Sequence, residues 1–301
     1  MMNQLQILLI LSFAFISFCE CCAQDITIIY TNNNNGNIAE CECEDLPYGG
    51  LARKKTVFDR IRSEHKNTVL VDAGDFLDQF GTRLSQDELV IKLYEKLGYD
   101  AVNIGDNELA NEKLFFDSKL LASKIPLVSS TLTNQKNGKV AKPYIIKIFG
   151  ALRVAFIGYT PKSSFQYFPA WKKLAVQIEN ERDQLKKALA EVSGKADLII
   201  LLSNAGDDED YNLAKAFPEI DIIVGGHSQV ELEEPVQIGK TIIVQAGGSG
   251  AYVGQLDITF TKKSNKAKII ANKLIPLDKS VKDHPETKKV IDEFLAHSKS
   301  K

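Results

Sequence analysis

Five short polar blocks in this chain carry carboxylates, amides and one imidazole, and each block follows an apolar stretch. The blocks read Thr31-Asn32-Asn33-Asn34-Asn35-Gly36-Asn37, Asp72-Ala73-Gly74-Asp75, Gly105-Asp106-Asn107-Glu108, Leu202-Ser203-Asn204 and Gly225-Gly226-His227-Ser228-Gln229. Open α/β sheets bind their ligands at the carboxyl ends of strands, so we expect the blocks to meet at one site. Carboxylates and imidazoles are strong ligands for divalent cations, whereas neutral amides are poor ligands for transition metals. The pattern predicts a metal-type pocket in which amides fill many ligand positions.

Strands and helices must alternate to bring these blocks together, and the apolar pattern predicts that they do. Short runs rich in Ile, Leu and Val indicate strands that are buried on both faces. Apolar residues that recur every three or four positions indicate helices. The expected strands are 26–30, 68–71, 101–104, 125–129, 144–148, 153–158, 198–202, 220–224, 241–245, 252–260 and 269–274; the expected helices are 51–62, 86–97, 114–123, 174–192 and 286–297. This alternation predicts an α/β fold.

The length and charge of the chain fit one large domain. The sequence has 301 residues and a formal net charge of -2. That length is enough for a well-buried core, and no stretch is basic enough to predict nucleic-acid binding. We find no internal repeat and no long linker. Residues 24–301 are therefore expected to form a single domain.

The first 23 residues are typical of an export signal. The apolar run Ile7–Phe18 has the length of a signal-peptide core and is short for a membrane span. Small residues at Cys21–Ala23 predict cleavage that leaves Gln24 at the start, and a lipoprotein leader cut before Cys19 is the alternative. We therefore expect a periplasmic, cell-surface or secreted protein whose only membrane contact is through such a lipid anchor.

Two cysteines, Cys41 and Cys43, lie beyond this leader. In an exported protein, a pair at this spacing can form a strained disulfide, bind a metal or bond to a partner. Two free thiols in a surface loop are the simplest alternative, and the sequence leaves all four readings open.

Two further blocks complete the pattern, Gly49-Gly50-Leu51-Ala52-Arg53 and Val244-Gln245-Ala246-Gly247. In this order the blocks resemble the metallophosphoesterase superfamily, and more narrowly the amino-terminal domain of secreted 5'-nucleotidases and UDP-sugar hydrolases. The resemblance runs from about Ile26 to Phe260. It implies a four-layer α/β/β/α sandwich of two mixed sheets, metals bound at the sheet edges, and hydrolysis of phosphoric esters. The carboxyl-terminal domain that gives family nucleotidases their nucleotide specificity is expected to be absent.

The resemblance assigns strong ligands to few of these positions. Asp75 and His227 match residues that bind metal in the family, and Asp106 stands where the family has a ligating asparagine. Amides replace one family aspartate and three family histidines, at Asn33, Asn35, Asn204 and Gln229. Asn107 stands at the histidine that assists the leaving group, and an amide cannot supply that proton. Arg53 is expected to support the pocket from a helix start or to contact an anionic substrate.

These departures predict one divalent cation and not a two-metal centre. Asp75, Asp106 and His227, with Asn204 as a carbonyl donor, form an oxygen-rich set that suits Mg²⁺, Mn²⁺ or Ca²⁺. Sequence drift in a site without a remaining task is the competing explanation. We expect a binding or accessory protein that is inactive or weakly active, with a protein or a small phosphorylated ligand as its partner. The alternative is an active phosphoric-ester hydrolase that uses one or two divalent metals in an altered site.

Overall fold

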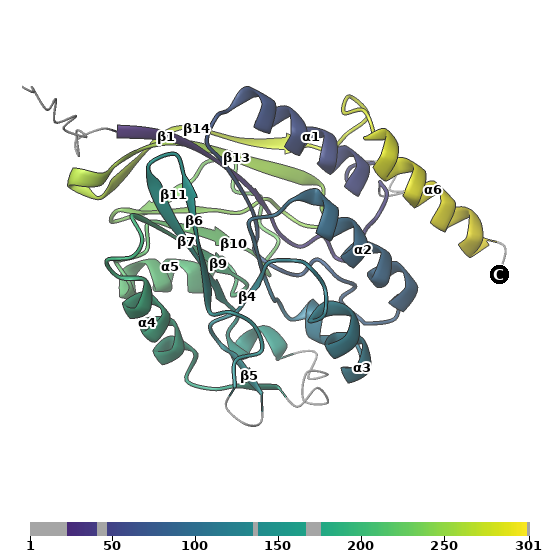
Figure 1. The fold of residues 1–301 in the computed structure, drawn as a ribbon, viewed down its shortest axis with the longest axis horizontal. Helices are drawn as coiled ribbons and strands as arrows, with labels where there is room; N and C mark the ends of the chain where they lie inside the picture. The colour runs from purple at the N-terminus through teal and green to yellow at the C-terminus, as the bar shows by residue number, and fades with distance from the viewer. Residues whose placement is uncertain (1–22, 41–46, 135–137, 167–175, 300–301) are drawn as a thin grey trace, which may run out of the picture.

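Two six-stranded sheets face each other at the centre of the molecule, with helices on both outer sides (Figure 1). The structure is a computed structural model that describes residues 23–40, 47–134, 138–166 and 176–299. Residues 1–22 of the leader and both Cys41 and Cys43 lie outside the described residues, so the expectations for them stay predictions.

The first sheet has the strand order β14-β13-β1-β2-β3-β4. Strands β1 to β4 run parallel to one another; β13 pairs antiparallel with β1, and β14 pairs antiparallel with β13. The bounds are β1 Ala23–Thr31, β2 Thr68–Asp72, β3 Ala101–Asn103, β4 Leu127–Val128, β13 Tyr252–Thr261 and β14 Lys266–Pro276. The carboxyl ends of β1, β2 and β3 therefore lie at one edge, where three of the polar blocks begin.

The second sheet has the order β11-β12-β10-β9-β7-β6. Strands β7, β9, β10 and β12 are parallel, and β6 and β11 pair antiparallel at the two edges. The bounds are β6 Tyr144–Phe149, β7 Leu152–Tyr159, β9 Leu198–Ser203, β10 Ile222–Gly225, β11 Val236–Ile238 and β12 Thr241–Val244. Both sheets are thus mixed, and β9 and β10 bring the two remaining blocks to the same end of the molecule.

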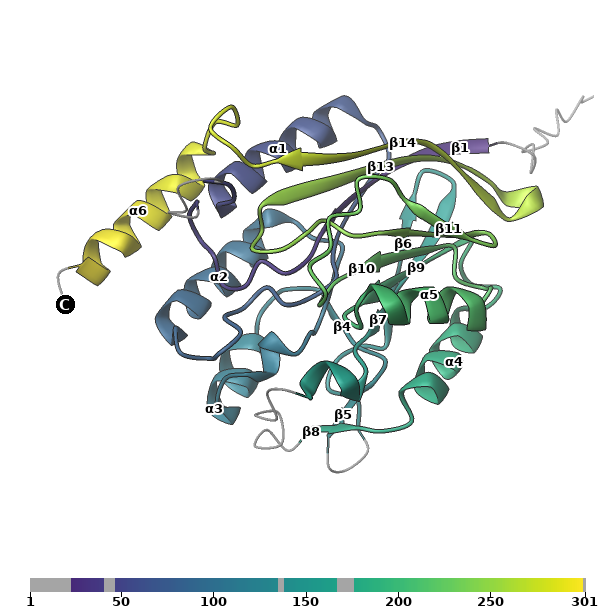
Figure 2. The same ribbon diagram turned by 180° about the vertical axis from the view of Figure 1, so that it is seen from behind.

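Alternating burial along the strands separates the molecule into four layers. In β1, Ile28 points into the core between the two sheets, and its neighbour Ile29 points into the core under the outer helices. Helices α1 (Leu51–Glu64) and α2 (Leu84–Leu97) cover the first sheet, and α4 (Glu181–Val192) and α5 (Asp207–Ala216) cover the second; α6 (Pro285–Lys299) packs against α1 (Figure 2). The expected four-layer α/β/β/α arrangement is confirmed. Among the described helices, none combines the length and apolar character needed to cross a membrane.

The predicted helix over 174–192 is wrong in its first part. Val176–Ile178 forms strand β8, which pairs antiparallel with β5 (Leu132–Asn134), and the helix begins only at Glu181. Asn180, with φ 51°, adopts the left-handed conformation between the two elements. Pairing with a distant strand outweighed the helical pattern, and the alternating burial of Val176 and Ile178 marks the strand.

The predicted helix over 114–123 is shorter and less regular than expected. It consists of one α-helical turn, Lys113–Phe115 (α3), followed by a π-helical segment, Phe116–Leu120. The short strands β5, β8 and β11 were not predicted. They have only three residues each, which is too few for a periodic pattern to stand out.

Gly254 in β13 leaves room for the ring of Tyr30, its partner in β1. Tyr30 is fully buried and its hydroxyl donates to Asn272 Oδ1 in β14 at 2.9 Å, so the ring crosses over Gly254. A Cβ atom at position 254 would lie 2.0 Å from that ring. We expect Gly254→Ala to lower the free energy of unfolding by about 1–3 kcal/mol, measured by urea unfolding.

The same substitution in a Tyr30→Ala background is the control for this steric cause. With the ring removed, the cost of Gly254→Ala is expected to fall clearly, because contacting residues couple in a double-mutant cycle. An equal cost in both backgrounds would show that Tyr30 is not the reason for glycine at position 254.

Candidate metal site

The five polar blocks meet where the two sheets present their carboxyl ends to each other. The loops after β1, β2 and β3 come from the first sheet, and those after β9 and β10 come from the second. Gly105 shows how closely the loops approach: a Cβ atom there would lie 2.3 Å from Asp75 Oδ1 and 2.8 Å from Asn204 Nδ2. A residue with a side chain would displace both of these polar groups. The expected meeting of the blocks is therefore present in the fold.

Asp75, Asp106 and His227 form a compact cluster in this site. One ligand atom from each of the three residues lies within 4.8 Å of the other two, which is close enough for a single cation. His227 Nδ1 lies 3.0 Å from Asp106 Oδ1 and 3.9 Å from Asp75 Oδ2. Asp75 is almost completely buried, whereas the His227 side chain is 29% exposed, so the cluster can be reached from solvent through the imidazole.

Without a bound cation, the imidazole and the two carboxylates of the cluster shift one another's pKa values. Hydrogen bonds to Asp106 and Asp75 raise the pKa of His227 to about 10, so the imidazolium is the favoured form at neutral pH. Burial and the Asp75 charge raise the pKa of Asp106 to about 7. Burial alone would raise the pKa of Asp75, but hydrogen bonding and charge from His227 outweigh it and hold that pKa below its ordinary value. The imidazolium thus lies where a cation would balance the two carboxylates.

Asn204 lies beside this cluster with its carbonyl oxygen unpaired. It is fully buried, its amide helps to hold the pKa of the Asp75 carboxyl below its ordinary value, and its Oδ1 has no hydrogen-bond partner among the described residues. Buried amides are normally hydrogen-bonded, and each exception calls for an explanation, such as an ion. A carbonyl oxygen, two carboxylates and an imidazole together fit one hard divalent cation. The residues present therefore fit a single cation.

The amides that stand at the other family positions are hydrogen-bonded to protein groups. Asn35 Nδ2 donates to Gln229 Oε1 at 3.2 Å, and Asn107 Nδ2 donates to Asn35 Oδ1 at 3.1 Å and to the Leu77 carbonyl at 3.1 Å. Asn33 lies closer to the cluster, where its Nδ2 donates to Asp75 Oδ2 at 2.9 Å. Within the described part of the chain, Asp75, Asp106 and His227 are the only three His, Cys, Asp or Glu side chains that lie close enough together to hold one metal ion.

The backbone of the site is held in an unusual conformation. Of the eight non-glycine residues with positive φ in the described ranges, five belong to these blocks: Asn33 (44°), Asn35 (51°), Asp75 (60°), His227 (72°) and Gln229 (58°). Asn, Asp and His adopt the left-handed region more often than other non-glycine residues do, but a glutamine is uncommon there. Such strain persists only where surrounding contacts fix it, and it concentrates at functional sites.

Glu108 is a functional residue whose role the sequence did not indicate. Its carboxylate is fully buried and accepts four backbone N–H groups, from Asp75, Phe76, Leu77 and Gly105, at 2.7–3.0 Å. It therefore fixes the loop that presents Asp75 and ties that loop to the one that carries Asp106. The residue stands inside a recognised block, but the sequence alone does not show that four donors converge on it.

Lys54 is a second residue that the sequence did not indicate. It is fully buried on α1, and its Nζ donates to Asn34 Oδ1 at 2.8 Å, in the middle of the asparagine run. Burial lowers the pKa of Lys54 to about 8, against an opposing effect from the charge of Asp72. In the sequence it is one of several basic residues in a helix, and nothing distinguishes it from those that face solvent.

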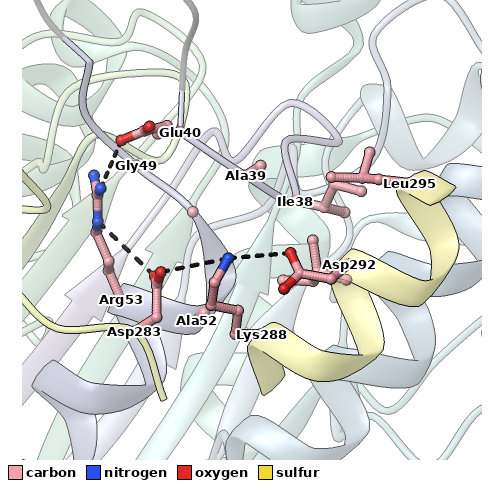
Figure 3. A pocket seen from close by; sticks show the side chains of 12 residues that line it. Ile38, Ala39, Glu40, Gly49, Ala52, Arg53, Asp283, Lys288, Asp292 and Leu295 are labelled. Atoms are coloured by element: carbon pink, nitrogen blue, oxygen red, sulfur yellow. Dashed lines mark hydrogen bonds and ion pairs between the residues drawn. The ribbon is translucent and has the colours of Figure 1, made fainter. Parts of the chain in front are cut away.

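Arg53 lies in a separate pocket of about 160 Å³ between α1, α6 and the loop before α1 (Figure 3). Its guanidinium group is held by Glu40 Oε2 at 2.5 Å, by the carbonyls of Pro47 and Leu277, and more distantly by Asp283 at 3.9 Å. These contacts connect the start of α1 to the segment that leads into α6. Arg53, one of the predicted site residues, therefore lies in this separate pocket, where protein groups bind its guanidinium N–H groups.

Comparison with known proteins agrees with this geometry. A sequence model of the family described as calcineurin-like phosphoesterase matches residues 41–231. An uncharacterized metallophosphoesterase, YunD of Bacillus subtilis, is 32% identical over 67% of this chain and 45% of its own length. A snake venom 5'-nucleotidase of Naja atra is 28% identical over 88% of this chain and 55% of its own. This chain spans about half the length of these curated relatives.

A solved structure supports the fold independently. The 5'-nucleotidase precursor of Thermus thermophilus superposes with a TM-score of 0.81 at 22% identity, over 92% of this chain and 59% of that one. At this identity the likeness concerns the fold alone. The family assignment rests on the sequence match to residues 41–231, which is more than half of the chain, and not on this superposition. The chain belongs to the calcineurin-like phosphoesterase family.

Proposed function

We propose that this protein binds one divalent cation, Mg²⁺, Mn²⁺ or Ca²⁺, and serves as an exported binding or accessory protein with little or no hydrolytic activity. The observation that carries the proposal is the cluster of Asp75, Asp106 and His227 beside the buried Asn204, whose Oδ1 has no hydrogen-bond partner among the described residues. When bound, a cation in such a site supplies positive charge that attracts phosphate oxygens. The chain's own residues hold and orient that cation, while the amide at Asn107 supplies no acid for a leaving group.

Separate observations support export and the class of partner. The apolar run in the first 23 residues supports export, and the similarity to a snake venom 5'-nucleotidase agrees with it. The partially exposed imidazole of His227 makes the site reachable from solvent, which supports a small phosphorylated ligand or a partner protein that contributes an anionic group.

A second candidate function is an active phosphoric-ester hydrolase with one or two divalent metals. It is favoured by the family and by the retained Asp75 and His227. Against it, Asn33, Asn35 and Gln229 are occupied in hydrogen bonds to protein groups, and amides are poor ligands for the transition metals that imidazoles bind. We therefore rank it below the binding role.

Calorimetric titration of chelator-treated protein tests cation binding directly. We expect one binding site for at least one of Mg²⁺, Mn²⁺ and Ca²⁺, and we expect Asp75→Asn to weaken it more than about tenfold. Asp208→Asn is the matched control, because it removes the same charge from an exposed position on α5 and should leave the affinity unchanged. Absence of binding by all three ions at millimolar concentration would overturn the proposal.

Hydrolysis assays separate the two candidate functions. The protein would be incubated with p-nitrophenyl phosphate, bis-p-nitrophenyl phosphate, nucleoside monophosphates and UDP-glucose, each with Mg²⁺, Mn²⁺, Ca²⁺, Co²⁺ or Zn²⁺. We expect turnover no greater than that of the Asp75→Asn variant. Substantial turnover that disappears in Asp75→Asn but persists in Asp208→Asn would establish the hydrolase alternative.

A further inference from the structure

Asn33 lies at the centre of the site, where every polar atom of its side chain is in use. Its Nδ2 donates to Asp75 Oδ2 at 2.9 Å. Its Oδ1 accepts from the backbone N–H of His227 at 2.9 Å and from Asn32 Nδ2 at 2.9 Å. The residue is only 2% exposed, so these contacts are shielded from water. One amide therefore contacts two of the three residues of the cation cluster at once.

The two residues that Asn33 contacts come from different sheets. Asp75 follows β2 of the first sheet, and His227 follows β10 of the second. We propose that Asn33 is a positioning residue that joins the two sheets at the cation cluster by hydrogen bonds, and so sets the spacing of Asp75 and His227. The proposal deepens the proposed function, because it rests on that cluster being the cation site.

An amide suits this position better than the aspartate that the family resemblance places there. A carboxylate could accept from the His227 N–H, but it carries no proton to donate to Asp75 at neutral pH. It would instead place two buried negative charges 2.9 Å apart, and like charges at such a distance strongly disfavour ionisation of both. Asn33 can therefore lie beside Asp75 without a cation, whereas an aspartate would need a cation to offset the repulsion between the two carboxylates.

A positioning role for Asn33 and sequence drift at position 33 predict different effects of Asn33→Asp on stability. Drift predicts that Asn33→Asp is neutral or favourable, because it restores the family residue. A positioning role predicts that Asn33→Asp lowers the melting temperature of the cation-free protein by about 5 °C at pH 7. Asn37→Asp is the matched control: Asn37 lies in the same loop, its side chain donates to the Ser249 carbonyl at 3.2 Å, and the substitution should shift the melting temperature by less than about 1 °C.

A swap of the two partners gives the decisive readout. In the double variant Asn33→Asp with Asp75→Asn, the amide at 75 can donate to the carboxylate at 33, so the pair is restored with its roles exchanged. We expect the double variant to recover most of the melting temperature that Asn33→Asp loses. A general loss of packing at position 33 would not be relieved by this exchange.

The proposed function and the positioning role fail in different ways. The melting temperatures are measured without any cation, so they test the positioning of Asp75 even if no cation binds. If cations do bind, Asn33→Ala is expected to weaken Ca²⁺ binding about tenfold, as loss of a supporting hydrogen bond to a ligand does. The inference is overturned if Asn33→Asp is as stable as the unchanged protein, or if the double variant only sums the effects of the single changes.

Discussion

Glu108→Gln is expected to lower the free energy of unfolding by about 3 kcal/mol, because one buried carboxylate serves four backbone donors. Oε1 accepts from the N–H groups of Phe76 and Leu77, and Oε2 accepts from those of Asp75 and Gly105. Burial and the nearby Asp75 charge raise the pKa of Glu108, and the four donors oppose that effect. In glutamine, whichever way the amide is turned, its NH₂ group faces two N–H donors and leaves them unpaired in the interior.

Urea unfolding measures this cost as a lower midpoint at an unchanged slope. Glu112→Gln is the matched control, since it makes the same substitution at an exposed position and is expected to change stability by no more than about 0.5 kcal/mol. The loop after β2 should also lose its fixed conformation in Glu108→Gln, so Ca²⁺ binding should weaken together with stability. Equal midpoints for the two variants would mean that Glu108 does not hold this loop.

The fold was predictable from the sequence wherever a long apolar run or a clear helical period exists. The strands that end at Asp72 and Ser203 are buried on both faces, so their residues are constrained to be apolar and the pattern is easy to read. The strand at Val176–Ile178 was assigned to a helix because its stability comes from pairing with Leu132–Asn134, more than 40 residues away. A local pattern contains no information about such a partner.

The candidate site was predictable in position but not in its hydrogen bonds. The sequence predicted that Asp75, Asp106 and His227 would lie near one another, and they form one cluster. Neighbouring parallel strands bring Asp75 and Asp106 to one edge of the first sheet, whereas His227 comes from the facing sheet. The sequence presented Asn33 and Asn35 only as missing ligands. Their contacts with Asp75 and Gln229 join loops more than 40 and 190 residues apart, and only the folded chain shows that these amides have partners.

Calcium affinity is expected to rise about a hundredfold between pH 7 and pH 9, because the cation must displace a proton from the cluster. The pKa of His227 is raised to about 10, so the imidazole is protonated throughout this range in the cation-free protein. One proton released per cation bound corresponds to about tenfold in affinity per pH unit below that pKa. Near pH 7 and below, the raised pKa of Asp106, about 7, adds a second proton and a steeper dependence.

Stability of the cation-free protein should show the opposite trend. A raised folded-state pKa means that the His227 contribution is fully present below about pH 6.5, the ordinary histidine value, and is lost as the pH rises through about 10. Saturating Ca²⁺ replaces the lost proton charge, so the stabilisation by Ca²⁺ should grow over this range. Melting temperatures with and without Ca²⁺ at pH 7, 8 and 9 measure that growth.

His227→Gln isolates the imidazole as the source of this dependence. Glutamine keeps an oxygen donor but has no proton to lose, so the affinity of the variant should be lower and nearly constant from pH 8 to pH 9. Calorimetry in two buffers with different ionisation enthalpies counts the released protons, about one for the unchanged protein at pH 8 and close to none for His227→Gln. A pH-independent affinity in the unchanged protein would mean that the cation does not bind through His227, and would leave Asp75, Asp106 and Asn204 as the only candidate ligands among those assigned to the site.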